Sequence, residues 1–326
     1  MLGPRTSLAG LLLAAVLLAS GSEHAGGNSR GTAFAGELSE ARNPSRSEAS
    51  RAAPSDQAIT PADRNWRAFW AKHLGQWHGR WTRYTPTGSV MESFRSTRDF
   101  QADPSHLHIQ QVNRYRYDDG RAVEERWSYN RADHSRADGF HHPASLVMRG
   151  LAFRDGAAAW LVPTLAPDAV VPMELFLMDG QRRHSVGVVY GKDRQLIRTA
   201  SIREDQRGYP GAHWTEQIAQ VSPWQVTGEW VGVTETMGPD LSRSTQRTRQ
   251  ITWPSQPNRE VYFPDRIVLS CPERLPRHQP FSVAVRWLSA DGRLQIIRAD
   301  YDAGARLTQL QHQVLRRAPR QGVSPG

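Results

Sequence analysis

Few segments of this sequence carry residue types at spacings that could perform chemistry. It contains no G-x-S-x-G, H-E-x-x-H or G-x-G-x-x-G segment, which excludes the usual nucleophile elbow, zinc-protease helix and dinucleotide-binding turn. The stretch from Gly187 to Asp193 resembles a phosphate-binding loop, but its glycines are one residue too close. Asp193 also stands where such a loop carries the Ser or Thr that binds magnesium. We therefore identify no catalytic residue and expect a protein that is not an enzyme.

Histidines occur at two spacings that metal ligands can use. His106 and His108 project from one face of an expected strand, and His141 and His142 lie in an expected loop. No third ligand accompanies either pair. We therefore expect solvated histidines and no metal site.

The other reactive groups have simpler explanations. Asp118, Asp119, Glu124 and Glu125 flank one predicted hairpin, where carboxylates serve turn formation and solvation. Cys271 is the only cysteine, which excludes an internal disulfide, and no recognisable base lies near it in the sequence. None of these residues is assigned to a site.

A set of aromatic and polar residues shares one face of three predicted strands and is typical of a binding cavity. Aromatic walls with a few polar groups suit an amphipathic ligand, and an arginine among them suits its carboxylate or phosphate group. The alternative is that the polar members, Gln111, Asn113 and Glu125, only bond with one another and with buried water. The predicted ligand-binding residues are Trp81, Arg83, Tyr115, Tyr117, Trp127 and Tyr129.

The elements that position these side chains are predicted to be short strands joined by tight turns. A short helix comes first, with Asp63 as its N-cap and Gly75 at its end. From there apolar and polar residues alternate for about a hundred residues, which indicates an antiparallel meander that closes into a barrel. The expected strands are 76–83, 90–100, 106–117, 123–129, 146–153, 157–162, 173–178, 182–190 and 195–203.

An internal repeat indicates a second unit of the same kind. The G-x-W-x-G segment Gly75–Gly79 recurs as Gly228–Gly232. Trp77 and Trp230 are expected to plug the closed end of each barrel, because a large ring fills a tapering interior. The flanking Gly75, Gly79, Gly228 and Gly232 are expected to allow a close backbone approach. The second unit is expected to hold strands at 245–253, 261–263, 267–270, 281–288, 294–301 and 307–315.

The G-x-W that opens the first strand after a short helix resembles the calycin superfamily, which includes the lipocalins. Its tandem repetition, with Arg83-Tyr84 and the C-terminal stretches Phe263-Pro264-Asp265 and Ser270-Cys271-Pro272, is similar to a cyanobacterial and algal family described as domain of unknown function 3598. The resemblance covers about residues 63–317. It implies two tandem antiparallel up-and-down β-barrels, each preceded by a short helix. It also implies an arginine over each plug: Arg198 or Arg203 over the first, and Arg298 or Arg316 over the second.

The N-terminus is typical of an export signal. Arg5 precedes an uncharged stretch, 8–19, and small residues follow. We expect an exported protein; a plastid protein, or a cytoplasmic one with an over-extended start, is the alternative. The expected divisions are a signal peptide at 1–22, a tether at 23–62, a first barrel at 63–206 and a shorter second barrel at 222–318.

The overall charge does not indicate a nucleic-acid partner. The 326 residues include 41 basic and 32 acidic side chains, a net charge of +9, without a run of basic residues. No transmembrane segment is expected in the mature protein.

The sequence predicts non-catalytic binding of a small hydrophobic or amphipathic ligand, such as a lipid, pigment or tetrapyrrole, with no other cofactor identified. The alternatives are an enzyme related to bilin lyases or isomerases, and a protein–protein assembly module with a filled barrel.

Overall fold

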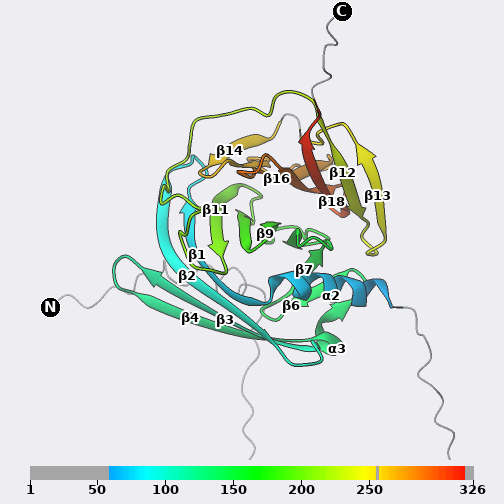
Figure 1. Cartoon of the computed structure of the whole chain (residues 1–326). Helices are drawn as coiled ribbons and strands as arrows, with labels where there is room; N and C mark the ends of the chain where they lie inside the picture. Colours follow the sequence, from blue (N-terminus) through cyan, green and yellow to red (C-terminus); the bar gives the residue numbers. More distant parts are fainter. Residues whose placement is uncertain (1–58, 255–256, 320–326) are drawn as a thin grey trace, which may run out of the picture.

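The structure is a computed structural model that describes residues 59–254 and 257–319 (Figure 1). The predicted signal peptide and nearly all of the predicted tether lie outside the described residues. Within the described part, no helix is long and apolar enough to cross a membrane.

The first element is helix α2, Pro61–His73. Its N-cap is Thr60, whose side chain accepts a hydrogen bond from the backbone N–H of Asp63 at 3.1 Å. The predicted cap, Asp63, lies instead in the first turn, because Pro61 begins the helix two residues earlier. The apolar stripe of α2 is buried and consists of Trp66, Phe69 and Trp70.

The first sheet has eleven antiparallel strands in the order β4-β3-β2-β1-β11-β10-β9-β8-β7-β6-β5. Its long strands confirm the predicted alternation, and two short ones, β5 and β6, occupy a stretch where none was predicted. A one-turn helix, α3 (Arg131–His134), joins β4 to β5. The strands are β1 (Gly75–Tyr84), β2 (Val90–Ala102), β3 (His108–Tyr117), β4 (Ala122–Asn130), β5 (Ser135–Arg136), β6 (Gly139–His142), β7 (Ser145–Ala152), β8 (Ala158–Leu161), β9 (Val171–Asp179), β10 (Arg182–Tyr190) and β11 (Leu196–Asp205).

The first sheet curls until its two ends meet through side chains. Tyr129 on β4 lies 5.6 Å from His142 on β6 and 6.3 Å from Trp160 on β8, measured between ring centroids. No backbone ladder joins β4 to β5 among the described residues. Strand pairing therefore does not produce the predicted barrel closure, and aromatic rings fill the seam.

The second sheet has seven antiparallel strands in the order β13-β12-β18-β17-β16-β15-β14. No helix precedes it in the described chain, so the predicted second helix is wrong; residues 214–229 form an irregular segment instead. The predicted strand 245–253 is also wrong in its second half, which is irregular after β13 ends. The strands are β12 (Trp230–Met237), β13 (Arg243–Thr248), β14 (Arg259–Phe263), β15 (Ile267–Cys271), β16 (Phe281–Leu288), β17 (Leu294–Tyr301) and β18 (Leu307–Arg317).

The G-x-W-x-G repeat occupies equivalent places in the two sheets. In each sheet the strand that carries it lies between the next strand and the last strand of that sheet: β1 between β2 and β11, and β12 between β13 and β18. A Cβ built on Gly79 would lie 2.4 Å from the carbonyl oxygen of Arg203, and one on Gly232 would lie 2.0 Å from that of Val314. Only glycine permits these approaches.

The two sheets share one hydrophobic core. A single cluster of buried side chains includes residues of α2, of the first sheet and of the second sheet. β16 and β17 pack against β9, and Figure 1 shows the second sheet, yellow to red, beside the green strands of the first. Tyr190 donates to the carbonyl oxygen of Pro272 at 2.9 Å, and Tyr301 to that of Val162 at 3.0 Å. The second sheet thus covers part of the first.

Candidate ligand-binding cavity

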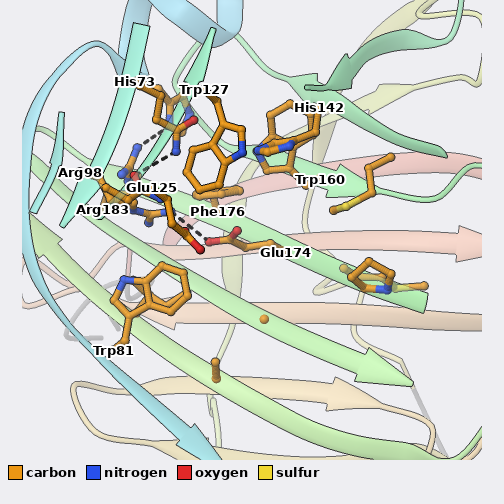
Figure 2. A pocket seen from close by; sticks show the side chains of 18 of the residues that line it. His73, Trp81, Arg98, Glu125, Trp127, His142, Trp160, Glu174, Phe176 and Arg183 are labelled. Carbon is orange, nitrogen blue, oxygen red and sulfur yellow. Dashed lines mark hydrogen bonds and ion pairs between the residues drawn. The ribbon is translucent and has the colours of Figure 1, made fainter. Parts of the chain in front are cut away.

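A cavity of about 110 Å³ lies inside the curl of the first sheet (Figure 2). Side chains from α2 and from nearly every strand of that sheet line it. Because side chains alternate between the faces of a strand, the inward residues of β1, β3 and β4 meet here. Five of the six predicted ligand-binding residues line the cavity: Trp81, Arg83, Tyr115, Trp127 and Tyr129.

The sixth predicted residue, Tyr117, does not line the cavity. It is the last residue of β3. Its ring centroid lies 4.5 Å from that of Phe94. The guanidinium of Arg121 lies 4.1 Å from the centroid of the Tyr117 ring. The ring of Tyr117 therefore contacts Phe94 on β2 and Arg121 in the hairpin that follows β3.

The seam of the sheet adds two rings to the cavity wall, His142 and Trp160, that were not among the predicted ligand-binding residues. The His142 ring lies 5.4 Å from that of Trp127 and 5.2 Å from that of Trp160, and all three line the cavity. His142 belongs to strand β6 and is buried, so its predicted place in a solvated loop is wrong. Its Nδ1 accepts from the backbone N–H of Ala144 at 3.1 Å, which leaves the proton of the neutral ring on Nε2. Burial lowers the pKa of His142 to about 3.

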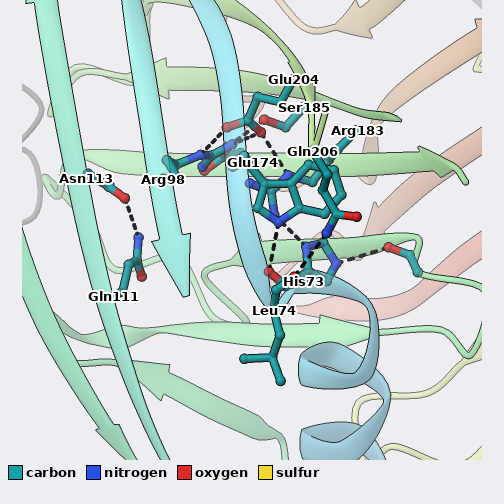
Figure 3. Close-up of polar contacts among 12 residues, drawn as sticks. His73, Leu74, Arg98, Gln111, Asn113, Glu174, Arg183, Ser185, Glu204 and Gln206 are labelled. Atoms are coloured by element: carbon teal, nitrogen blue, oxygen red, sulfur yellow. Dashed lines mark hydrogen bonds and ion pairs between the residues drawn. The ribbon is translucent and has the colours of Figure 1, made fainter. Parts of the chain in front are cut away.

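Polar side chains on β3 and β4 form a continuous hydrogen-bonded chain along the cavity wall. The Tyr129 hydroxyl donates to Gln111 at 2.7 Å, and the Gln111 amide donates to Asn113 at 3.0 Å (Figure 3). Asn113 donates to the Tyr115 hydroxyl at 2.9 Å, which donates to a carboxylate oxygen of Glu125 at 3.1 Å. Gln111 and Asn113 thus bond with each other and with the two tyrosines, and Glu125 accepts from Tyr115.

The polar end of the cavity carries Arg83. Its guanidinium is 5% exposed, pairs with Glu92 on β2, and lies 5.0 Å from the centroid of the Phe94 ring. A second buried arginine, Arg198 on β11, also lines the cavity. Burial, followed by the charge of Arg83, lowers the pKa of Arg198 to about 10. Two arginines and the carboxylate of Glu92 therefore lie at this end.

A buried ion cluster forms the base of the cavity. Arg98 binds Glu204 through two parallel hydrogen bonds of 2.6 and 2.5 Å, and Arg183 donates to the same carboxylate at 2.8 Å (Figure 3). Glu174 accepts from Ser185 at 2.7 Å. The charges of Arg183 and Arg98 outweigh desolvation and lower the pKa of Glu204 to about 2. The cluster is internally compensated and serves as a rigid floor.

Helix α2 is fixed to this floor by His73. A guanidinium can only donate, so Nδ1 of His73 accepts from Arg183 at 2.9 Å. The other ring nitrogen then carries the proton and donates to the carbonyl oxygen of Gly156 at 3.1 Å. Desolvation, then the charge of Arg183, lowers the pKa of His73 well below its usual value.

The two tryptophans predicted as plugs are buried, and the arginines predicted to cover them are wrong. Trp77 is fully buried, and the guanidinium that covers its ring is that of Arg183, at 4.3 Å, rather than Arg198 or Arg203. Over Trp230 lies Arg317, at 5.4 Å, rather than Arg298 or Arg316. Arg183 comes from β10, which β11 separates from β1, whereas Arg317 lies directly opposite Trp230 on the adjoining strand β18.

The cavity fits an organic ligand better than a metal ion. No cluster of three metal-ligating side chains occurs within residues 59–254 and 257–319. Among the described residues that line the cavity, five buried polar groups have no hydrogen-bond partner: the indole N–H groups of Trp70 and Trp81, Nε of Arg83, Nη2 of Arg183 and the hydroxyl of Thr199. Acceptor oxygens of a ligand could satisfy them.

Comparison with known proteins shows a family match over the first sheet. Residues 62–209 match the family described as Domain of unknown function (DUF3598), N-terminal. These residues, which are less than half of the chain, carry the similarity to the DUF3598 family. The predicted family resemblance is confirmed, and the DUF3598 match covers α2 and all eleven strands of the first sheet. No curated protein matches the chain.

Solved structures support the fold. The crystal structure of a DUF3598 protein of unknown function from Nostoc punctiforme is similar, with a TM-score of 0.60 and 17% identity over 78% of this chain and 99% of that one. An S-type phycobiliprotein lyase from Guillardia theta matches at 12% identity over 44% of this chain and 93% of that one, with a TM-score of 0.30. Rv2717c from M. tuberculosis matches at 12% identity over 77% and 98%, with a TM-score of 0.21. The last two likenesses carry no argument about this chain.

Proposed function

We propose that the curled first sheet acts as a calycin-like container that binds a small amphipathic molecule without transforming it. The observation that carries this proposal is the combination of aromatic walls with unpartnered buried donors in one cavity. A buried donor without a partner costs about 1–3 kcal/mol, which a bound acceptor recovers. A rigid floor and a fixed helix keep the cavity preformed.

The size of the cavity limits what can be enclosed. An engineered protein cavity of about 150 Å³ accepts benzene, and the cavity here measures about 110 Å³. It therefore suits one ring or a short chain, with the rest of a larger ligand outside. A lipid or a tetrapyrrole could place only part of its structure here.

The direct test is native mass spectrometry, with absorbance, of the full chain purified from its own organism. We expect a small organic adduct on the wild type. It should be absent from Gly187→Leu, because Gly187 lines the cavity and a Cβ there meets only the Ala200 methyl, at 3.4 Å. An adduct of equal occupancy in both proteins would refute the cavity as the site. A chemically altered adduct would favour the enzymatic alternative, and a partner protein in place of an adduct the assembly alternative.

We also propose export through residues 1–22. Deletion of these residues should retain the protein in the cytoplasm and leave its folding unchanged. A mature protein that begins at Met1 would contradict this.

A further inference from the structure

Three carboxylates lie at or beside the cavity, and they differ in how fully their hydrogen-bonding capacity is used. Glu204 is fully buried and binds Arg98 and Arg183. Glu174 accepts from Ser185, with Arg98 at 3.5 Å. Glu125 receives a single hydrogen bond from the described chain, that of Tyr115 to Oε2. Glu125 is therefore the one of these three that has no arginine within ion-pair distance, and its carboxylate has the most acceptor capacity left for a ligand.

The orientation of Glu125 is set by the chain of hydrogen bonds that ends on it. Each donor from Tyr129 through Gln111 and Asn113 is committed to the next acceptor, so the Tyr115 hydroxyl has its proton available for Glu125. Such a chain fixes the carboxylate before a ligand arrives. It also leaves the amide groups of Gln111 and Asn113 occupied with each other and with the two tyrosines.

The surroundings of Glu125 leave its charge incompletely compensated. Desolvation raises its pKa, while the Tyr115 hydrogen bond and the charge of Arg83 act against this rise. Arg83 itself pairs with Glu92. A hydrogen-bond donor on a ligand would stabilise the Glu125 carboxylate where the chain does not.

We infer that Glu125 makes the cavity selective for ligands that carry an O–H or N–H group within their buried part. This inference rests on the proposed function and adds the class of ligand. Tyr115 acts as a positioning residue, because its hydroxyl binds Glu125 and this role requires no contact with the ligand. A ring that presents a donor toward β4 thus binds more tightly than a ring of the same shape without one.

The test compares phenol with fluorobenzene, which have nearly the same shape but differ in the donor. Fluorine NMR measures fluorobenzene binding to the full chain, and displacement by phenol at neutral pH gives the phenol dissociation constant. We expect phenol to bind about tenfold more tightly, the ratio typical of one hydrogen bond to a charged acceptor. Glu125→Leu should abolish this ratio while fluorobenzene still binds. Tyr115→Phe should reduce it.

The neighbouring carboxylate provides a matched control. Glu124 precedes Glu125 on β4 but faces outward, where it binds Arg114 and Arg126. Glu124→Gln should therefore keep the full preference for phenol. Equal affinities of the wild type for phenol and fluorobenzene, or an unchanged ratio in Glu125→Leu, would overturn the inference. A wild type that binds neither probe would instead overturn the proposed function.

Discussion

The guanidinium of Arg183 lies across the ring of Trp77, 4.3 Å from its centroid, and joins the plug of the first sheet to the ion cluster at its base. The indole N–H of Trp77 donates to the carbonyl oxygen of His73 at 2.9 Å, so the same ring also holds the end of α2. One tryptophan thus connects the helix, the first strand and the cavity floor.

Trp77→Ala should destabilise the protein by about 3–5 kcal/mol, the usual cost of removing a buried tryptophan. The substitution leaves Arg183 without the ring that covers it. Urea denaturation of wild type and variant measures the change in the free energy of unfolding. Trp230→Ala, which empties the equivalent place under Arg317, should act similarly. A denaturation midpoint like that of the wild type in either variant would show that the repeat is not a core element.

Arg83→Gln should weaken the binding of benzoate about tenfold, because a desolvated arginine–carboxylate pair is strong. It should change the binding of fluorobenzene little. Glu92→Gln is the matched reverse test: it frees Arg83 from its ion pair and should strengthen benzoate binding. Titration calorimetry gives both affinities. If the two substitutions shift benzoate binding in the same direction, Arg83 is not the anion-binding group.

Trp127→Ala should weaken benzoate and fluorobenzene alike, by about tenfold, since the indole supplies stacking surface irrespective of charge. Trp253→Ala removes an indole of similar partial exposure from the irregular segment after β13 and should leave both affinities unchanged. Selective loss of benzoate binding in Trp127→Ala would contradict the assigned role of the wall.

Stability should fall as the pH is lowered from about 7 to about 5, because His73 and His142 have pKa values below those of the unfolded chain. The stability that these two neutral rings contribute is complete above the ordinary histidine pKa of 6.5 and decreases as the pH falls below that value. Each adds a slope of up to about 1.4 kcal/mol per pH unit. Glu204, with a pKa of about 2 against 4.5, acts in the same direction at lower pH.

Urea denaturation as a function of pH measures this slope. His142→Gln removes one titrating group, so the slope should decrease by up to about 1.4 kcal/mol per pH unit, the contribution of one proton. A wild-type stability that is flat over this interval would contradict the burial of these rings.

The strand pattern predicted much of the fold and of the cavity wall, because a period of two places Trp81, Tyr115 and Trp127 on inward faces once the strands are recognised. Tyr117 obeys the same period, but it lies at the end of its strand, and the period does not indicate where a cavity stops. His142 was missed because β5 and β6 are too short to show a pattern. A face assignment for β10 would have found Arg183.

Contacts between distant strands could not be predicted in this way. The pairing of Arg98 on β2 with Glu204 on β11 depends on register across three strands. Closure into a barrel was inferred from the number of strands, whereas the seam between β4 and β6 is filled by Tyr129 and His142 without a ladder.

The most direct measurement of ligand binding in this cavity is the fluorine NMR signal of fluorobenzene in the presence of the full chain. The wild type should broaden and shift this signal. Gly187→Leu should leave the signal sharp, and Val233→Leu, which places the same side chain at an exposed site, should behave as the wild type. Urea denaturation verifies that both variants fold. A sharp, unshifted signal with the folded wild type, or equal broadening by Gly187→Leu, would contradict ligand binding in this cavity.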